Sequence, residues 1–240
     1  HDNRDIGLSH KFDGAKAPGA VRHTLMRKIG LRPSVPYTLA DMAEDSAGVL
    51  DALGIESAHV VGGSMGGMIA QHLAAKHPEK VRSLTSIFST TGNPKLPSSK
   101  RGAIKALTQR PASVEEEELV KHGKNVARVI GSPGFPAPDD RLDARTRALV
   151  QRSVYLQGPV RQMAAIIDDG ERTRMLRQIK APTLVLHGDD DPLIPVAHGH
   201  ATAAAIPGAK IRTIPGWGHD IPLELVDELA DEIARHARAV

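Results

Sequence analysis

Apolar residues recur along this chain with two different spacings, which predict strands that alternate with helices. Short apolar runs, typical of strands, occur at 58–61, 81–88, 183–186 and 210–214. Apolar positions three and four residues apart, typical of helices, occur at 39–53, 65–77, 201–205 and 226–237. Residues 1–37 are polar and rich in Gly and Pro, so we expect a loop there. This alternation predicts an α/β fold, with a mainly parallel sheet that helices cover on both faces.

Residues typical of helix ends support several of these elements. Thr38 and Asp41 form a capping pattern before the first helix, and Gly54 stands where a helix commonly ends. Ser113 with Glu116 forms a second capping box, which predicts a helix start at that point. The final helix is predicted to bury one apolar face, made of Val226, Leu229, Ala230, Ile233 and Ala237.

The middle of the chain differs in composition from both flanks. From 92 to 178, Arg, Glu and Ala increase and no strand pattern occurs, so we expect helices throughout. A stretch rich in Gly and Pro, 131–136, divides this block into two halves. The sequence therefore predicts two core segments, 1–91 and 179–240, separated by a helical insertion over 92–178.

Composition excludes several classes of function. The 240 residues include no cysteine, which excludes disulfides, thiolate metal sites and a cysteine nucleophile. The net charge is only +3, and three Phe, two Tyr and one Trp are scattered, so we expect no nucleic-acid partner. His198 and His200 are two residues apart in a predicted helix and point in different directions, so we expect no metal site.

The sequence also bears on membranes and location. The longest stretch without a charged residue, 57–75, contains four Gly and several polar side chains, so we expect neither a membrane span nor a membrane partner. The chain opens with Asp2, Arg4 and Asp5 rather than with an apolar segment. We therefore expect no signal peptide and a cytoplasmic protein.

One short motif carries a specific chemistry. Residues 62–66 read Gly-Gly-Ser-Met-Gly, which fits G-x-S-x-G, and they lie between a predicted buried strand and a predicted buried helix. A sharp strand-to-helix turn would expose the Ser64 hydroxyl, and we expect Gly62 and Gly66 to leave the space that this turn needs. The motif therefore predicts that Ser64 is a nucleophile; the alternative is a capped turn with a structural role only.

A serine nucleophile needs a base and an acid that orients the base, and both follow in the expected chain order. Asp189, Asp190 and Asp191 come directly after the strand at 183–186, and His219 follows the strand at 210–214. The carboxyl ends of parallel strands meet at one sheet edge, so these side chains are expected near Ser64. We select Asp191 as the acid because Pro192 fixes its turn, and His219 as the base.

Taken together, these segments resemble the α/β-hydrolase fold over essentially the whole chain. The matching segments are 2–9, 62–71, 187–195 and 216–220, and the second is similar to the nucleophile elbow of carboxylesterases of the aclacinomycin methylesterase type. The resemblance implies a helical cap over 92–178 that shapes the substrate pocket. It also implies that Ser64 is the nucleophile, His219 the general base and then acid, Asp191 its orienting partner, and the Met65 N–H one oxyanion donor.

The sequence departs from that family at its beginning. In the family, four strands precede the loop that resembles 2–9, and the loop after the third of them supplies the second oxyanion N–H. None of these strands occurs in this sequence, so the strand at 58–61 is expected to expose a bare edge. We therefore hypothesise that the chain is a fragment of a longer hydrolase, or that it forms a homo-oligomer through this edge.

The sequence predicts a serine hydrolase that cleaves carboxylic esters of small molecules through an acyl-enzyme and needs no cofactor. Lactone, thioester and carbon–carbon bond hydrolysis use the same residues and stay open. The alternative from another class is a non-catalytic binding or remnant protein that kept the elbow without a complete oxyanion hole.

Overall fold

A four-stranded parallel sheet forms the centre of the molecule. The structure, a computed structural model, describes residues 1–240, and its strands lie in the order β1-β2-β3-β4. Their bounds are β1 Ala58–Gly63, β2 Val81–Ile87, β3 Thr183–Gly188 and β4 Lys210–Ile214. Each neighbouring pair is parallel, so all four carboxyl ends meet at one edge of the sheet. The predicted α/β fold is confirmed.

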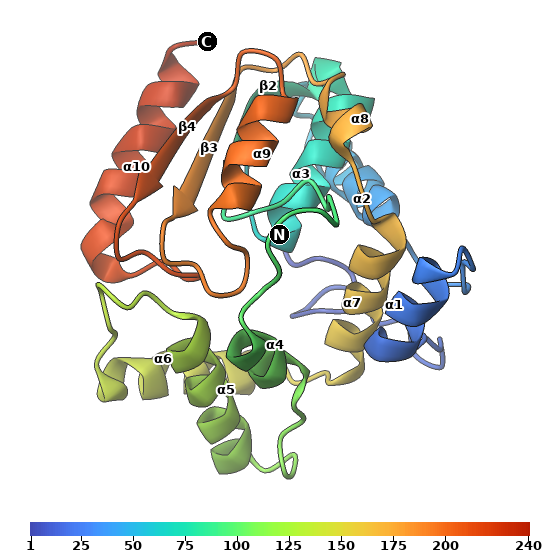
Figure 1. The fold of residues 1–240 in the computed structure, drawn as a ribbon, viewed down its shortest axis with the longest axis vertical. Helices are drawn as coiled ribbons and strands as arrows, with labels where there is room; N and C mark the ends of the chain where they lie inside the picture. Colours follow the sequence, from blue (N-terminus) through green and yellow to red (C-terminus); the bar gives the residue numbers. More distant parts are fainter.

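Helices cover both faces of this sheet (Figure 1). They bury two separate apolar cores. The larger core joins one face to α2 (Leu39–Ala52), α3 (Met65–Lys76), α8 (Thr173–Leu176) and α9 (Ala197–Ala205). The smaller core joins Leu184 and Leu186 of β3 to Leu225 and Leu229 of α10 (Leu223–Arg238). Alternate residues of a strand point to opposite faces, so β2 supplies Leu84 to the larger core and Ile87 to the smaller one.

Between β2 and β3 the chain forms helices only. These are α4 (Arg101–Thr108), α5 (Glu116–Ile130), α6 (Asp139–Arg152) and α7 (Gln157–Asp169), followed by the short α8. Figure 1 shows α4, α5 and α6 gathered beyond the carboxyl edge of the sheet, while α7 packs against α1 (Ala20–Lys28). We interpret 92–178 as a cap on this arrangement. None of the helices combines the length and apolar composition that crossing a membrane would require.

Two sequence predictions about local structure are wrong, and a third is right only in part. Residues 20–28 form α1 inside the predicted loop, because tertiary packing against α7 stabilises a helix of only 9 residues. Helix α5 begins after Glu115, which has no side-chain cap, so the capping box from Ser113 to Glu116 does not form. Helix α10 buries Leu229 and packs Ile233 against the smaller core as predicted, but it also buries Leu225 and leaves Val226 and Ala230 exposed.

The first strand is an edge strand rather than a fully buried one. Strand β1 pairs only with β2, and the Val61 side chain is 47% exposed. A groove of about 350 Å³ follows its outer side, lined by residues that include Val49, Val60 and Ile69. The expected bare edge is therefore present. Pairing of two copies through it stays a prediction.

Candidate active site

The turn from β1 into α3 holds Ser64 in an unusual backbone conformation. Ser64 has φ of 52°, in the region that L residues rarely adopt. A side chain at Gly62 would overlap the Gly66 carbonyl, and one at Gly67 would overlap the Ser89 side chain. Gly66 itself faces open space, so the second crowded glycine is Gly67 and not Gly66 as the sequence suggested. Tight packing on both sides of the turn is what holds Ser64 in its strained conformation.

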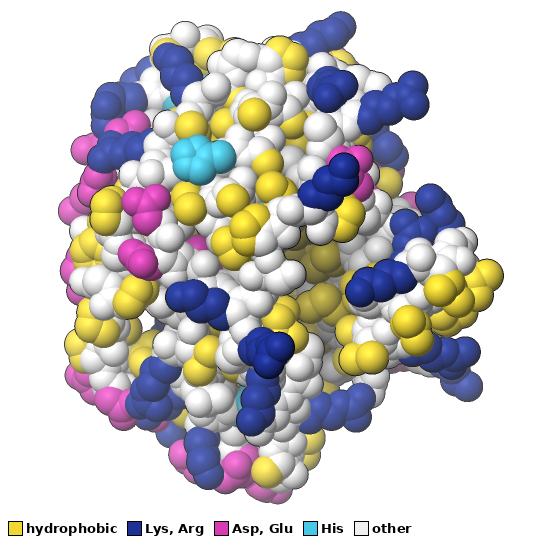
Figure 2. Space-filling model, in the orientation of Figure 1, with side chains coloured by type: hydrophobic (Ala, Val, Ile, Leu, Met, Phe, Trp, Pro, Cys, Tyr) yellow, Lys and Arg dark blue, Asp and Glu magenta, His cyan; other side chains and the backbone are white.

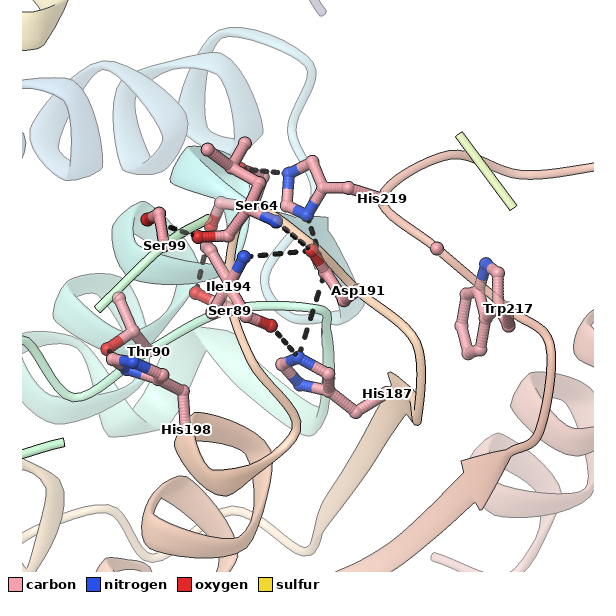
Figure 3. Close-up of polar contacts among 12 residues, drawn as sticks. Ser64, Ser89, Thr90, Ser99, His187, Asp191, Ile194, His198, Trp217 and His219 are labelled. Carbon is pink, nitrogen blue, oxygen red and sulfur yellow. Dashed lines mark hydrogen bonds and ion pairs between the residues drawn. The ribbon is translucent and has the colours of Figure 1, made fainter. Parts of the chain in front are cut away.

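A continuous chain of hydrogen bonds joins Ser64, His219 and Asp191 (Figure 3). His219 Nδ1 lies 2.7 Å from Asp191 Oδ2, and His219 Nε2 lies 2.9 Å from Ser64 Oγ. A carboxylate can only accept, so Nδ1 carries the proton and Nε2 of the neutral ring accepts from the Ser64 hydroxyl. Asp191 and His219 are buried while Ser64 is half-buried, so Ser64 is the most exposed of the three residues. The structure thus brings all three predicted side chains together.

The loop after β3 fixes the Asp191 carboxylate from both sides. Its Oδ1 accepts from the backbone N–H groups of Leu193 and Ile194, each at 2.8 Å. Oδ2 is left for His219. Asp189 and Asp190 are exposed, and Asp190 accepts from the Gly216 N–H at 2.8 Å. Of the three consecutive aspartates, only Asp191 therefore reaches the histidine.

A second histidine, His187, lies on the other side of Asp191. It is fully buried, and its Nε2 donates to the Ile194 carbonyl at 2.7 Å while lying 3.8 Å from Asp191 Oδ2. Its Nδ1 has no hydrogen-bond partner, and the ring packs directly on Gly199 of α9. Burial lowers the pKa of His187, so the ring stays neutral and donates only from Nε2. His187 therefore holds the loop that carries Asp191 through its hydrogen bond to the Ile194 carbonyl.

Two residues just after β2 support the site and were not selected from the sequence. The Phe88 ring lies 4.6 Å from the His219 ring and 5.7 Å from the Trp217 ring, between centroids. Ser89 donates from Oγ to the Ser64 carbonyl at 2.8 Å. Phe88 also has positive φ, 34°, so the chain bends sharply as β2 ends. The only sequence signal for both was their place at the carboxyl end of a strand.

The segment between α5 and α6 holds the loop that carries His219. The His219 N–H donates to the Ile130 carbonyl at 2.8 Å, and the Gly218 N–H donates to Ser132 Oγ at 2.9 Å. Ser132 in turn donates to Asp220 Oδ1 at 2.5 Å. The sequence predicted 131–136 only as a break between helices. The structure shows that this break also positions the histidine.

Other histidines have partners that account for their positions. His198 lies 2.6 Å from Thr90 Oγ1 through Nδ1 and 2.9 Å from the Pro97 carbonyl through Nε2. His72 on α3 lies 2.7 Å from Asp169 Oδ1, and Arg172 also binds that carboxylate. The histidine of the hydrogen-bonded chain is therefore His219, as its place after the last strand suggested.

A second buried carboxylate, Asp5, lies in the N-terminal segment. Arg161 of α7 donates to both of its oxygens, at 2.7 and 2.9 Å, and the Tyr37 hydroxyl donates at 2.7 Å. The Phe12 N–H adds a bond of 2.8 Å. Burial acts to raise the pKa of Asp5, but the bonds from Arg161, Phe12 and Tyr37 outweigh it and lower the pKa to about 2. Asp5 thereby ties the segment before α2 to α7.

Comparison with known proteins agrees with this fold. A family model described as the alpha/beta hydrolase fold matches residues 26–224. A rhodomycin D methylesterase of Streptomyces sp. strain C5 is 28% identical over 259 aligned positions, covering 100% of this chain and 80% of the relative. A 2-hydroxy-6-oxononadienedioate/2-hydroxy-6-oxononatrienedioate hydrolase of Cupriavidus pinatubonensis is 34% identical over 178 residues, which is 72% of this chain and 59% of the relative.

A solved structure extends the similarity in fold. The 2-hydroxy-6-oxo-6-phenylhexa-2,4-dienoate hydrolase of Rhodococcus sp. strain RHA1 superposes with a TM-score of 0.71 at 19% identity, over 99% of this chain and 78% of that chain. The family model spans most of the sequence, and the chain belongs to the α/β-hydrolase family. It is a hydrolase of that family, and two of its relatives are rhodomycin D methylesterases of Streptomyces.

Proposed function

We propose that this chain is a serine hydrolase that cleaves carboxylic esters of small molecules. The observation that carries the proposal is the hydrogen-bonded chain from Asp191 through His219 to Ser64. A neutral histidine that accepts from the serine hydroxyl can take its proton as the oxygen attacks. Asp191 then faces the imidazolium that forms, because it already accepts from Nδ1.

The reaction proceeds in two halves. Ser64 Oγ bonds to the ester carbonyl carbon while its proton moves to His219 Nε2, and the carbonyl oxygen becomes an oxyanion. The bond between the carbonyl carbon and the alkoxy oxygen then breaks, and His219 gives its proton to that oxygen. The alcohol leaves, and the acyl group stays on Ser64 as an ester. Water then gives a proton to His219 and attacks the acyl carbon, and the returning proton restores Ser64 as the acid leaves.

Donors to the oxyanion are expected at the beginning of α3. The helix begins at Met65, directly after Ser64, so the first N–H groups have no carbonyl partner one turn earlier. We assign the Met65 N–H as one oxyanion donor. Loss of one donor of two commonly lowers turnover by about 10²- to 10³-fold, so this chain is expected to react more slowly than an enzyme with both unless another N–H replaces the second donor.

Two relatives support a particular substrate class. Similarity to rhodomycin D methylesterases over the full chain favours a carboxylic methyl ester as the substrate. The same three side chains can open a lactone or a thioester, because both offer an acyl carbon and a leaving group to the same nucleophile. Rates on matched methyl ester, thioester and lactone substrates would separate these reactions, and the methyl ester is expected to give the highest kcat/KM.

The proposal is tested with a fluorophosphonate probe, which reports an activated serine without requiring the right ester. Intact mass is expected to show one phosphonyl adduct per chain, lost in Ser64→Ala. The matched control is Ser98→Ala, which removes an exposed serine hydroxyl elsewhere and is expected to keep the adduct. Absence of an adduct on folded protein would contradict the proposal and support the non-catalytic alternative.

A further inference from the structure

The surface of α1 combines cations with exposed apolar side chains in a way that the active site does not explain. Between Asp13 and Asp41 the sequence has no acidic residue. The same stretch contains five basic residues, which are Lys16, Arg22, Arg27, Lys28 and Arg32. This segment is therefore strongly positive in a chain whose overall charge is nearly balanced.

Three apolar residues form an exposed stripe along α1. Val21, Leu25 and Ile29 follow one another at four-residue steps and are 87%, 61% and 67% exposed. A helix turns about 100° per residue, so these side chains span only about 80° of its circumference. On the same scale, Arg22 lies just beyond Ile29 and Lys28 just before Val21. The stripe therefore has a cation on each side.

The opposite face of α1 is fixed to the rest of the molecule. His23 is fully buried, with Nε2 4.0 Å from Asp168 Oδ1 on α7, and Met26 is half-buried on the same side. Helix α1 lies at the outer margin of the molecule (Figure 1). Figure 2 shows apolar and basic side chains together on the lobe at the right, where α1 lies in Figure 1. The stripe thus faces outward and cannot turn inward without exposing His23.

We propose that α1 docks the protein on an anionic lipid surface, with Val21, Leu25 and Ile29 inserted at the boundary between headgroups and acyl chains. Apolar residues flanked by Lys and Arg suit a helix that lies in the plane of such an interface. The flanking stems can lie along the acyl chains while their charged ends reach the lipid phosphates. This inference differs from the sequence expectation of no membrane partner, which considered only a span.

Charge complementarity favours lipid over a second copy of the chain. Two copies meeting through this surface would bring two segments of five cations and no anions together, which is unfavourable. An anionic bilayer instead supplies negative charge across the whole plane that the helix contacts. The stripe is also a convex ridge on a projecting helix, a shape that enters a soft interface without a matching groove.

The experiment is co-sedimentation of the full chain with vesicles. Binding is expected to vesicles of phosphatidylcholine with phosphatidylglycerol, and not to phosphatidylcholine alone, and 0.5 M salt is expected to weaken it. Each cation near an anionic surface changes partitioning by about fivefold. The triple variant Arg22→Gln, Lys28→Gln, Arg32→Gln is therefore expected to bind about 100-fold more weakly, and Leu25→Ser is expected to weaken binding independently of salt.

Matched controls place the same changes elsewhere on the surface. The triple variant Lys121→Gln, Arg145→Gln, Arg238→Gln removes three exposed cations, and Leu149→Ser removes an exposed leucine from α6. Both controls are expected to bind like the wild type. Equal losses in the controls, or no binding by the wild type, would overturn the proposal. A dimer in sedimentation velocity that Leu25→Ser abolishes would overturn it in favour of self-association.

Discussion

Asp191 and Asp5 are both fully buried carboxylates held by several donors, yet their partners differ in charge. Asp191 accepts from two backbone N–H groups and from the His219 ring. Asp5 accepts from one backbone N–H, a tyrosine hydroxyl and both arms of the Arg161 guanidinium. One carboxylate thus has no permanent cation beside it, and the other has one in direct contact.

This difference separates a chemical role from a structural one. The negative charge of Asp191 can stabilise a positive charge that appears on His219 during reaction, because nothing else has already neutralised it. The charge of Asp5 is matched in the resting protein, so it can stabilise only the connection between the N-terminal segment and α7. The following predictions test this contrast, from the largest effect to the smallest.

Asp191→Asn and Asp5→Asn are expected to affect different properties. In Asp191→Asn an amide replaces the acceptor for Nδ1–H, so the favoured histidine tautomer is lost and kcat should fall about 10⁴-fold with little change in unfolding temperature. Asp5→Asn should lower the unfolding temperature and leave kcat per folded molecule nearly unchanged. Ester turnover and thermal unfolding measured on both variants check this. Equal loss of kcat in both would contradict different roles for Asp191 and Asp5.

Arg161→Met should destabilise the fold by leaving Asp5 buried without its cation. Removal of one partner from a buried ion pair commonly costs about 3–5 kcal/mol, which lowers Tm by about 10 °C in a chain of this size. The matched control is Arg152→Gln, which breaks an exposed pair with Asp2 and is expected to leave Tm unchanged. Calorimetry on both variants measures this, and a small shift for Arg161→Met would show that Asp5 is not held as described.

Acid should remove the contribution of Asp5 to stability in a defined range. Folding lowers the pKa of Asp5 from 3.8 to about 2, so the folded state favours the charged carboxylate. The stabilisation from Asp5 is therefore complete only at a pH above its pKa in the unfolded chain. About 2 kcal/mol should be lost as the pH falls from about 5 through 2. Denaturant unfolding against pH should show a shallower slope in Asp5→Asn over that range. Parallel slopes in the two proteins would contradict the assignment.

His187→Leu should loosen the loop that positions Asp191. Loss of the bond to the Ile194 carbonyl is expected to lower kcat/KM about tenfold, because small displacements of a catalytic group are costly. His187→Gln keeps an N–H in reach and should recover part of the rate. Steady-state kinetics across pH on both variants tests this. Equal rates in the two variants would mean that the imidazole only fills space.

Much of the fold followed from local pattern. Short apolar runs marked all four strands, and the capping box of Thr38 with Asp41 formed as expected. Errors arose where packing outweighed local preference. Helix α1 depends on α7, which is far away in sequence, and the buried face of α10 depends on which residues β2 and β3 present to it. Periodicity indicates that a helix has an apolar face, but the neighbouring elements decide which residues at the margin of that face are buried.

The sequence by itself determined the order of strands and helices, the G-x-S-x-G turn, and the three side chains that meet at the carboxyl edge. It could do so because parallel strands bring residues after their ends together whatever the intervening chain does. Only the tertiary structure decided that Gly67 is crowded instead of Gly66, that Phe88, Ser89 and Ser132 support the site, and that Arg161 neutralises Asp5. These contacts join segments up to 156 residues apart, and such long-range packing has no periodic signature in the chain.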